Sequence, residues 1–355
     1  MVMQKKYYLP LALFVQIVLV QLISCFPEFI EGFYSNGLYI YSSSFSRIIF
    51  GFIPFSIGDF GYLIAVVVLI IGYFKNRKIA KLSGKDRILK ILSFFSVFYF
   101  LFNILWGLNY YRVPLFEKLK IEKEYSNEDL LKFTKQLISK TNSIHYQITN
   151  NDTLKVVFPY SQNQVFEMNF NGYQSLSNQI PAFTYKYSSI KKSLFSLPLS
   201  YMGFSGYLNP FTNEAQVNDK IPMYNFPTTI THEIAHQLGY ASESEANFIG
   251  FLASINNENL YFQYSGYSHA LHYCLSNWRF NDEVQFKKLL KTVHPGIIKN
   301  YKESEDFWSN YESFVETGFH LFYDRFLKVN QQKDGIDGYS KFVDLLVNYY
   351  KNKNL

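Results

Sequence analysis

HEIAHQLGYASESEANF, residues 232–248, gathers two histidines and three glutamates into one short stretch. The whole chain has 355 residues and only seven histidines. His232 and His236 are four residues apart, so on a helix they would lie on one face, one turn apart. In a chain of this composition the pattern H-E-x-x-H should arise by chance about 0.01 times, which makes it moderately specific. The competing interpretation is a solvated helix with two surface histidines.

The residues around this pattern predict a short amphipathic helix. Pro227 suits the first turn of a helix, and Ile230, Ile234 and Leu238 form an apolar stripe at a spacing of four. Gly239 is placed to end the helix in a left-handed conformation. The helix lacks the continuous apolar run of an intramembrane segment, so we expect its chemistry to occur outside a bilayer.

Two imidazoles one turn apart can bind one Zn²⁺, and Glu233 lies beside them, where it can polarise a metal-bound water. A zinc site needs a third protein ligand. Ser242 and Glu245 have the spacing of a capping box, which gives Glu245 a structural role and favours Glu243 as the third ligand, with Glu245 as the alternative. Asn247 is expected to hydrogen-bond a ligating imidazole, or else to be an ordinary exposed helical residue.

The combination of HEIAH and ESEAN resembles the gluzincin group of zinc peptidases, whose third ligand is a glutamate on the following helix. The gap between His236 and Glu243 is shorter than in that group. The H-x-x-G turn resembles that of metzincins, but Ser242 stands where their third histidine would be. The chain as a whole resembles a bacterial membrane family called domain of unknown function 3810. That resemblance is carried by PFSIGD (54–59), GYLNPFTNEAQVN (206–218), HEIAHQLG, ESEANFIGFLA and YSGY (264–267).

The resemblance implies a zinc metallopeptidase, a hydrolase in which Glu233 acts as general base on a zinc-activated water and then protonates the leaving amine. Tyr267 or His272 is the expected transition-state stabiliser. His269 and His272 could instead form a second metal site, although packing roles are favoured. The 206–218 segment could supply a strand for an extended peptide, with Tyr207 and Phe211 as core residues in the alternative.

Two other classes of function stay open at this stage. One is a non-catalytic membrane sensor or assembly protein that uses the zincin-like fold to bind a partner. The intact Glu233 argues against it, because a purely structural site needs no general base. The other is a zinc hydrolase that acts on a cell-wall amide. We expect a peptide or protein substrate, Zn²⁺ as the cofactor and no nucleic-acid partner, and we leave the oligomeric state open.

Apolar residues crowd the first 110 positions. They predict a membrane domain, 1–110, with three transmembrane helices at about 7–25, 57–74 and 91–110. The remainder, 111–355, is expected to be a mostly helical, extracytoplasmic zincin-like α+β domain, with a short strand region before the H-E-x-x-H helix. Ser126 and Asp129 have capping-box spacing, and further helices are predicted at 266–279, 282–292, 306–328 and in YSKFVDLLVNYYK.

Charge predicts the orientation of these spans in a bacterial inner membrane. The segment KNRKIAKLSGKDRILK, 75–90, carries seven Lys or Arg against one acidic residue. The positive-inside rule puts this segment and the N-terminus in the cytoplasm, and the catalytic domain on the periplasmic side. The net charge of +6 comes mostly from this loop. The first span could alternatively be a signal peptide with Cys25 as a lipid-anchor site, and two cysteines define no disulfide framework.

Overall fold

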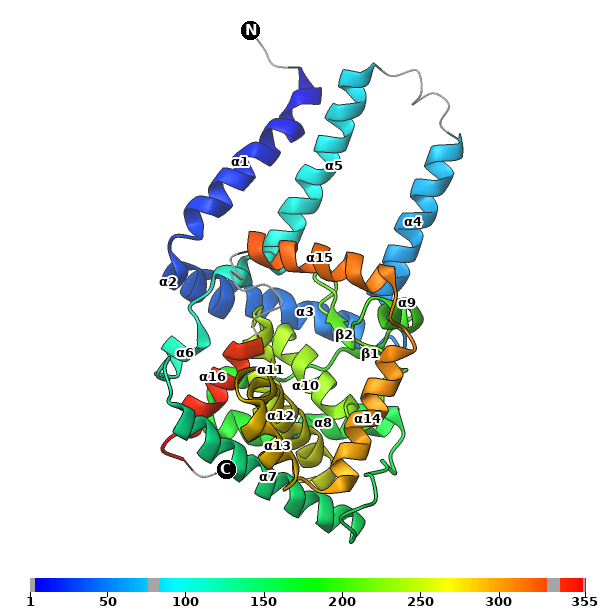
Figure 1. Ribbon diagram of the computed structural model, residues 1–355. Helices are drawn as coiled ribbons and strands as arrows, with labels where there is room; N and C mark the ends of the chain where they lie inside the picture. Colours follow the sequence, from blue (N-terminus) through cyan, green and yellow to red (C-terminus); the bar gives the residue numbers. More distant parts are fainter. Residues whose placement is uncertain (1–3, 76–82, 331–338, 354) are drawn as a thin grey trace.

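The computed structural model describes residues 4–75, 83–330, 339–353 and 355. The protein is mainly helical and contains a small three-stranded sheet. Three apolar helices project from one side of a helical body (Figure 1). The predicted fold class, mainly α with a short strand region before the H-E-x-x-H helix, is confirmed at this level.

The three projecting helices are α1 (Tyr8–Ile23), α4 (Ile57–Lys75) and α5 (Gly84–Leu105). Two helices are long and apolar enough to cross a membrane: Lys5–Ile23, which includes the turn before α1, and α5. The apolar part of α4, Ile57–Gly72, is shorter, so among the described residues two helices of this length stand against the three predicted spans. Part of the basic segment used to predict orientation, residues 76–82 of 75–90, lies outside the described residues.

The third predicted span also ends earlier than expected. Helix α5 stops at Leu105, and residues Gly107–Tyr111 form a 3-10 turn, η4. Four of these five residues are buried against the body, among them Asn109 and Tyr110. The chain therefore leaves the apolar helix before position 110, because it must enter the core of the body there.

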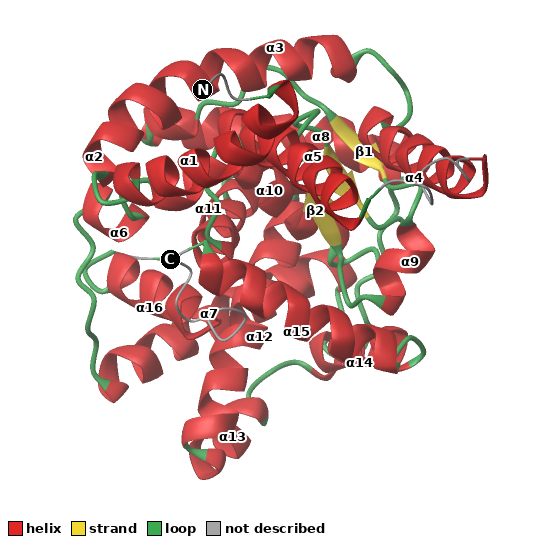
Figure 2. Cartoon of the chain, turned by 90° about the horizontal axis from the view of Figure 1, so that it is seen from above, coloured by secondary structure: helices red, strands yellow, loops and turns green. Residues whose placement is uncertain are grey.

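Two further helical segments lie across the base of the projecting helices (Figure 1). The first runs from α2 (Pro27–Phe29) through the π-helical η2 (Ile30–Leu38) to α3 (Tyr39–Gly51). The second is α15 (Phe314–Val329). Seen from above, α3 and α15 flank the three apolar helices on opposite sides (Figure 2). Tyr39 of α3 and Leu327 of α15 belong to one buried cluster with Trp106 and Tyr110.

The body is built around α10 (Phe226–Gln237), α11 (Glu243–Ile255) and α12 (Leu260–Asn281), which pack against one another. Its core is rich in fully buried aromatic side chains such as Phe226, Phe251 and Tyr264. The other elements are α6 (Leu115–Lys118), α7 (Asn127–Thr149), α8 (Gln162–Gln179), α9 (Ser196–Tyr201), α13 (Glu283–Leu290), α14 (Pro295–Ser309), α16 (Tyr339–Tyr350), and the 3-10 turns η1 (Lys5–Tyr7) and η5 (Pro181–Phe183).

The sheet has the strand order β1-β3-β2. Strand β1 (Ile190–Lys192) runs parallel to β3 (Ala215–Val217), and β2 (Gly206–Leu208) runs antiparallel to β3. The central strand β3 packs on α10. Within the described residues β2 is an edge strand, so one side of its backbone stays unpaired next to α10.

Several local predictions are confirmed. Ser126 caps α7 together with Asp129 in a complete capping box. Pro227 lies in the first turn of α10, and Gly239 has a φ of +86° at its end. The single helix predicted at 306–328 is wrong, because α14 ends at Ser309 and α15 begins at Phe314. The Asn310 side chain there donates a hydrogen bond back to the Asp306 carbonyl, in the last turn of α14.

A test of this packing uses Gly172, where α8 crosses α11. A Cβ at Gly172 would lie 2.2 Å from the carbonyl oxygen of Ala253, which is backbone and cannot rotate away. We expect Gly172→Ala to lower the free energy of unfolding by about 1–3 kcal/mol. The control is Gly318→Ala in α15, where no atom lies within 4 Å of the new methyl group. Chemical denaturation of the full-length protein in detergent measures both, and equal effects would contradict the close crossing.

Candidate metal centre

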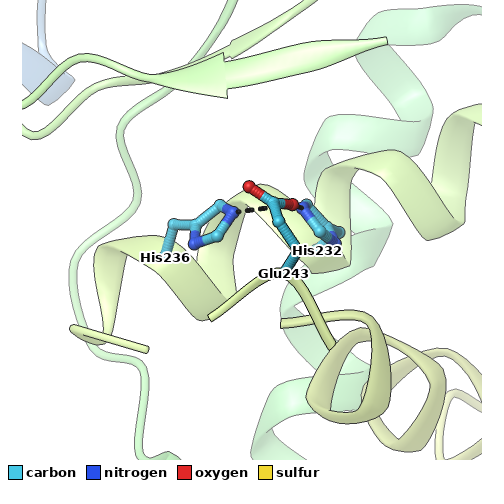
Figure 3. A group of neighbouring side chains, drawn as sticks. All are labelled: His232, His236 and Glu243. Atoms are coloured by element: carbon cyan, nitrogen blue, oxygen red, sulfur yellow. Dashed lines mark ion pairs between the residues drawn. The ribbon is translucent and has the colours of Figure 1, made fainter. Parts of the chain in front are cut away.

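Helices α10 and α11 bring His232, His236 and Glu243 together (Figure 3). The Nε2 atom of His232 lies 3.2 Å from Oε2 of Glu243, and Nε2 of His236 lies 3.7 Å from the same oxygen. One ligand atom from each residue lies within 4.8 Å of the other two. The structure thus gathers the three residues that the sequence predicts as a ligand set.

Each imidazole is oriented by a hydrogen bond at its other nitrogen. Nδ1 of His232 lies 2.9 Å from Oδ1 of Asn247, as predicted. Nδ1 of His236 lies 2.7 Å from the backbone carbonyl oxygen of Tyr240, a partner that the sequence did not indicate. Such partners fix the tautomer and leave Nε2 free as a ligand, which is the usual arrangement of metal-binding histidines.

The donor set fits a zinc ion. Zn²⁺ favours imidazole nitrogen and carboxylate oxygen, with bonds of about 2.0–2.2 Å in a tetrahedral arrangement. Neighbouring ligand atoms around such an ion lie about 3.3–3.5 Å apart. The distances of 3.2 and 3.7 Å from the Glu243 oxygen to the two histidines bracket that spacing. Three protein ligands would leave a fourth position open, as catalytic zinc sites require.

The turn after α10 places Glu243 opposite the histidines. Gly239 takes the left-handed conformation, and a Cβ there would meet Tyr39 and Asn109 at about 3 Å. The turn is held because the last carbonyl groups of α10 accept hydrogen bonds from side chains of the N-terminal third of the chain. These bonds are Trp106 Nε1 to His236 O, Tyr39 Oη and Arg47 Nη1 to Gln237 O, and Arg112 Nη1 to Gly239 O.

Glu245, the alternative ligand, points away from the histidines. Its Oε1 accepts a hydrogen bond of 2.6 Å from the backbone N–H of Leu115, at the start of α6. The predicted capping box with Ser242 is wrong, because the Ser242 side chain makes no capping bond and contacts the Ser244 hydroxyl instead. Glu245 does have a structural role, but the amide that it caps belongs to another helix.

Glu233 lies beside the cluster on the inner face of α10. Its side chain is buried, and its Oε2 has no hydrogen-bond partner in the described part of the chain. Burial raises the pKa of this carboxyl to about 7, although the nearby His232 and His236 oppose the shift. A Cβ at Gly206 would lie 2.7 Å from Oε1, so the carboxyl group packs directly under strand β2. A buried carboxyl group with an unused oxygen suits proton transfer.

Tyr323 of α15 also reaches the cluster. Its hydroxyl donates a hydrogen bond of 2.5 Å to Oε1 of Glu243, the oxygen that does not face the histidines. Burial opposes ionisation of Glu243, but the charges and hydrogen bonds of His236 and His232 hold its pKa well below the usual range. No motif in the sequence pointed to Tyr323, which lies 80 residues after Glu243.

The two predicted transition-state stabilisers lie elsewhere. Tyr267 is buried and packs edge-on against Phe251, and His272 is exposed and contacts the ring of Tyr301. His269, one turn before Tyr273, does face the site, and burial lowers its pKa to about 3. Among the described residues the cluster at His232 is the one group of three potential metal ligands, so His269 and His272 do not form a second such group.

A cavity of about 780 Å³ opens above the cluster. Its floor holds His232, Glu233, His236 and Glu243. Its walls come from α4, α5, α9, β2 and α15, and they are mostly apolar. The residues of these walls include Leu63, Val66, Phe102, Trp106, Gly206, Leu208, Phe319, His320, Phe322 and Tyr323.

The fold and the cluster together define a helical protein with an H-E-x-x-H helix whose two histidines face a glutamate on the next helix. The chain belongs to the family described as protein of unknown function (DUF3810), whose family model matches residues 34–347. This match confirms the resemblance seen in the sequence and extends from η2 into α16. No curated protein and no solved structure matches the chain.

A pair of glutamate substitutions tests the ligand set. We expect Glu243→Gln to abolish stoichiometric zinc binding, because a neutral amide is a poor third ligand. Glu245→Gln should retain zinc and lower only the thermal stability, since this side chain caps α6. Zinc content by mass spectrometry and melting temperature, measured on the full chain, separate the two. Zinc loss in the Glu245 variant alone would overturn the assignment.

The Tyr323 hydroxyl can be tested separately. Tyr323→Phe removes one hydrogen bond to Glu243 and keeps the ring, so we expect zinc affinity to fall by about 10- to 100-fold. Tyr311→Phe, in the turn between α14 and α15, is the matched control and should leave affinity unchanged. Competition with a zinc chelator measures both. Equal affinities would show that Tyr323 does not support the ligand.

Proposed function

We propose that this protein is a membrane-anchored zinc metallopeptidase that hydrolyses peptide bonds outside the cytoplasmic membrane. The observation that carries the proposal is the position of Glu233. Its buried carboxyl group, with one unused oxygen, lies between a His-His-Glu cluster and the unpaired edge of a strand. These are the three parts that peptide hydrolysis needs: a metal centre, a proton-transfer group and a place for an extended backbone.

His232, His236 and Glu243 would hold the ion. A zinc ion bound there supplies Lewis acidity, which polarises the substrate carbonyl and acidifies water. The two imidazoles donate hydrogen bonds from Nδ1 to the Asn247 side-chain oxygen and the Tyr240 carbonyl oxygen, and these bonds keep them in the ligating orientation. The Tyr323 hydroxyl donates a hydrogen bond to Glu243 and so holds this carboxylate in its ligating orientation.

Glu233 moves the protons. Hydrolysis adds one water across the amide: its oxygen bonds to the carbonyl carbon, the C–N bond breaks, and the amine leaves with a proton. Glu233 takes a proton from the water and gives it to the leaving nitrogen, so it ends each cycle in its initial state. A pKa near 7 suits both steps, because the group can accept and release a proton at neutral pH.

Strand β2 would bind the substrate backbone. Tyr207 pairs with Gln216 on β3, so antiparallel alternation turns the backbone groups of Gly206 and Leu208 toward the free edge. Both residues line the cavity. An extended peptide added there gains backbone hydrogen bonds without help from side chains. Gly206 also lets this backbone approach Glu233 closely, because a side chain at that position would collide with the carboxyl group.

Helices α1 and α5, with α4, whose apolar part is shorter than the two candidate spans, would anchor the protein in the bacterial inner membrane. Exposed apolar side chains cover them, such as Val18, Leu69 and Phe94. Lys6 pairs with Asp86 at a distance of 3.0 Å, at the ends of α1 and α5 farthest from the body (Figure 1). The basic residues at these ends favour a cytoplasmic location for them, which puts the body and its metal centre on the periplasmic side.

The alternatives differ from this proposal at the same site. A non-catalytic sensor would not need Glu233. The carboxyl group is buried without full hydrogen bonding, which costs stability, and a catalytic role accounts for that cost. A hydrolase of a cell-wall amide would use the same residues on another substrate. His320, which lines the cavity, takes the place of Tyr267 and His272 as the candidate to stabilise the transition state.

The test compares Glu233→Gln with Glu258→Gln, an exposed glutamate in the turn between α11 and α12. We expect the zinc-loaded full chain to cleave members of a peptide library. Glu233→Gln should retain zinc and lose about 10²- to 10⁴-fold in rate, because general acid–base transfer is removed. Glu258→Gln should behave as the unmodified protein does.

Two outcomes would contradict the proposal. The first is that the zinc-loaded protein cleaves no library peptide but releases products from cell-wall fragments. That result would make it a hydrolase of cell-wall amides. Full cleavage by Glu233→Gln would remove the assigned general base. Cleavage by mass spectrometry and zinc content, measured on the same samples, distinguish these results.

A further inference from the structure

Exposed apolar side chains gather at the base of the three projecting helices. On α15, Phe314 is 88% exposed, Phe322 64% and Val329 73%. On and after α3, Tyr41 is 76% exposed and Phe52 87%. Both helices lie across the base of α1, α4 and α5, on opposite sides of them (Figures 1 and 2). Exposed apolar side chains of this size favour a non-aqueous neighbour, so with the anchoring proposed above this level would be where the bilayer surface meets the body.

The cavity above the metal centre extends to this same level. Leu63 and Val66 of α4 and Phe322 of α15 belong to its wall, and each is about half exposed or more. Helix α4 stands apart from the neighbouring α1 and α5 (Figure 1). This apolar, upper part of the cavity is lined by α4 and α15, and with the membrane anchoring proposed above it would face the hydrocarbon region. The lower end holds the ionisable groups of the cluster.

The two ends of the cavity suit different parts of a substrate. At the lower end, β2 offers free backbone groups to a peptide. At the upper end, the walls are α4, α5 and α15, whose backbone groups are already paired within each helix. An extended peptide backbone there would leave its own N–H and C=O groups without partners, which is strongly unfavourable in an apolar setting. A hydrocarbon chain has no such groups.

We propose that the cavity takes from the membrane a peptide that carries a long hydrocarbon chain. The chain lies between α4, α5 and α15, and the amide to be hydrolysed lies along β2 at the metal centre. The substrate class is thus an acylated, membrane-held peptide, and entry is lateral through the opening beside Val66. This inference rests on the proposed function for the bond that is cleaved, but the binding of the chain does not depend on catalysis.

Binding is tested with the zinc-loaded Glu233→Gln full chain in lipid nanodiscs, so that the probe stays intact. The probe is a tetra-alanine amide whose amino end carries a dibrominated palmitoyl chain, because bromine quenches nearby tryptophan fluorescence. Trp106 lines the cavity and is 6% exposed, so bulk lipid does not reach it. We expect the probe to quench this tryptophan, and Trp106→Phe to remove the quenched signal. Unbrominated palmitoyl-tetra-alanine should restore the fluorescence.

Two valines on α4 give a matched pair of variants. Val66→Phe narrows the opening, whereas Val68→Phe adds the same group on an exposed surface outside the cavity wall. We expect loss of quenching in the Val66 variant and normal quenching in the Val68 variant. Leu63→Phe, one turn from Val66, provides a second narrowing variant. Zinc content shows whether each variant has kept the folded site.

Three results would overturn the inference. Equal quenching in the Val66 and Val68 variants would place the chain in the surrounding bilayer. Equal displacement by a hexaleucyl-tetra-alanine peptide without an acyl chain would assign the cavity to apolar peptide segments. Absence of quenching in the Glu233→Gln protein without a further substitution would show that the hydrocarbon chain does not enter the cavity. Failure of the peptidase proposal gives a different result, because chain binding would persist while no amide is cleaved.

Discussion

The carbonyl end of α10 is the constraint on which the rest of the structure depends. A helix leaves its last four carbonyl groups without partners, and this end carries partial negative charge. Here the partners come from far along the chain: Arg112 reaches Gly239, and Arg47 and Tyr39 both reach Gln237. These bonds fix the turn that brings Glu243 back to the histidines. The boundary predicted near residue 110 stays untested, but Tyr39 and Arg47 before it and Arg112 just after it supply contacts that shape the candidate metal centre.

The sequence was sufficient where a feature depends on neighbouring residues. The spacing of His232 and His236 gives one helix face, and Gly239 ends that helix because a left-handed residue is needed there. Asn247 was predicted from its position one turn beyond Glu243, and its bond to His232 follows. The short strand region was predicted before the H-E-x-x-H helix, and the strands lie before α10. Each inference needed only the spacing of residues along one helix or strand, or the residue that ends it.

The sequence failed where a distant group decides the outcome. Ser242 and Glu245 have the spacing of a capping box, but the amide of Leu115 attracts the Glu245 carboxylate instead. Tyr323 lies beyond a helix boundary that the apolar pattern of 306–328 concealed. Tyr267 was a reasonable choice by proximity in sequence, yet α12 turns it into the core. No local pattern encodes such pairings, because they arise only when the helices pack.

Helix α15 links two environments through one rigid element. One face carries Phe314 and Phe322 outward, and the other donates the Tyr323 hydroxyl to Glu243. Two binding equilibria that share an element are thermodynamically coupled, and the coupling free energy is the same in both directions. If lipid contact holds α15 in place, it strengthens metal binding, and a bound metal strengthens lipid contact by an equal factor. The protein would then be most completely metallated in its membrane, and a chain extracted from the bilayer would release its ion more readily.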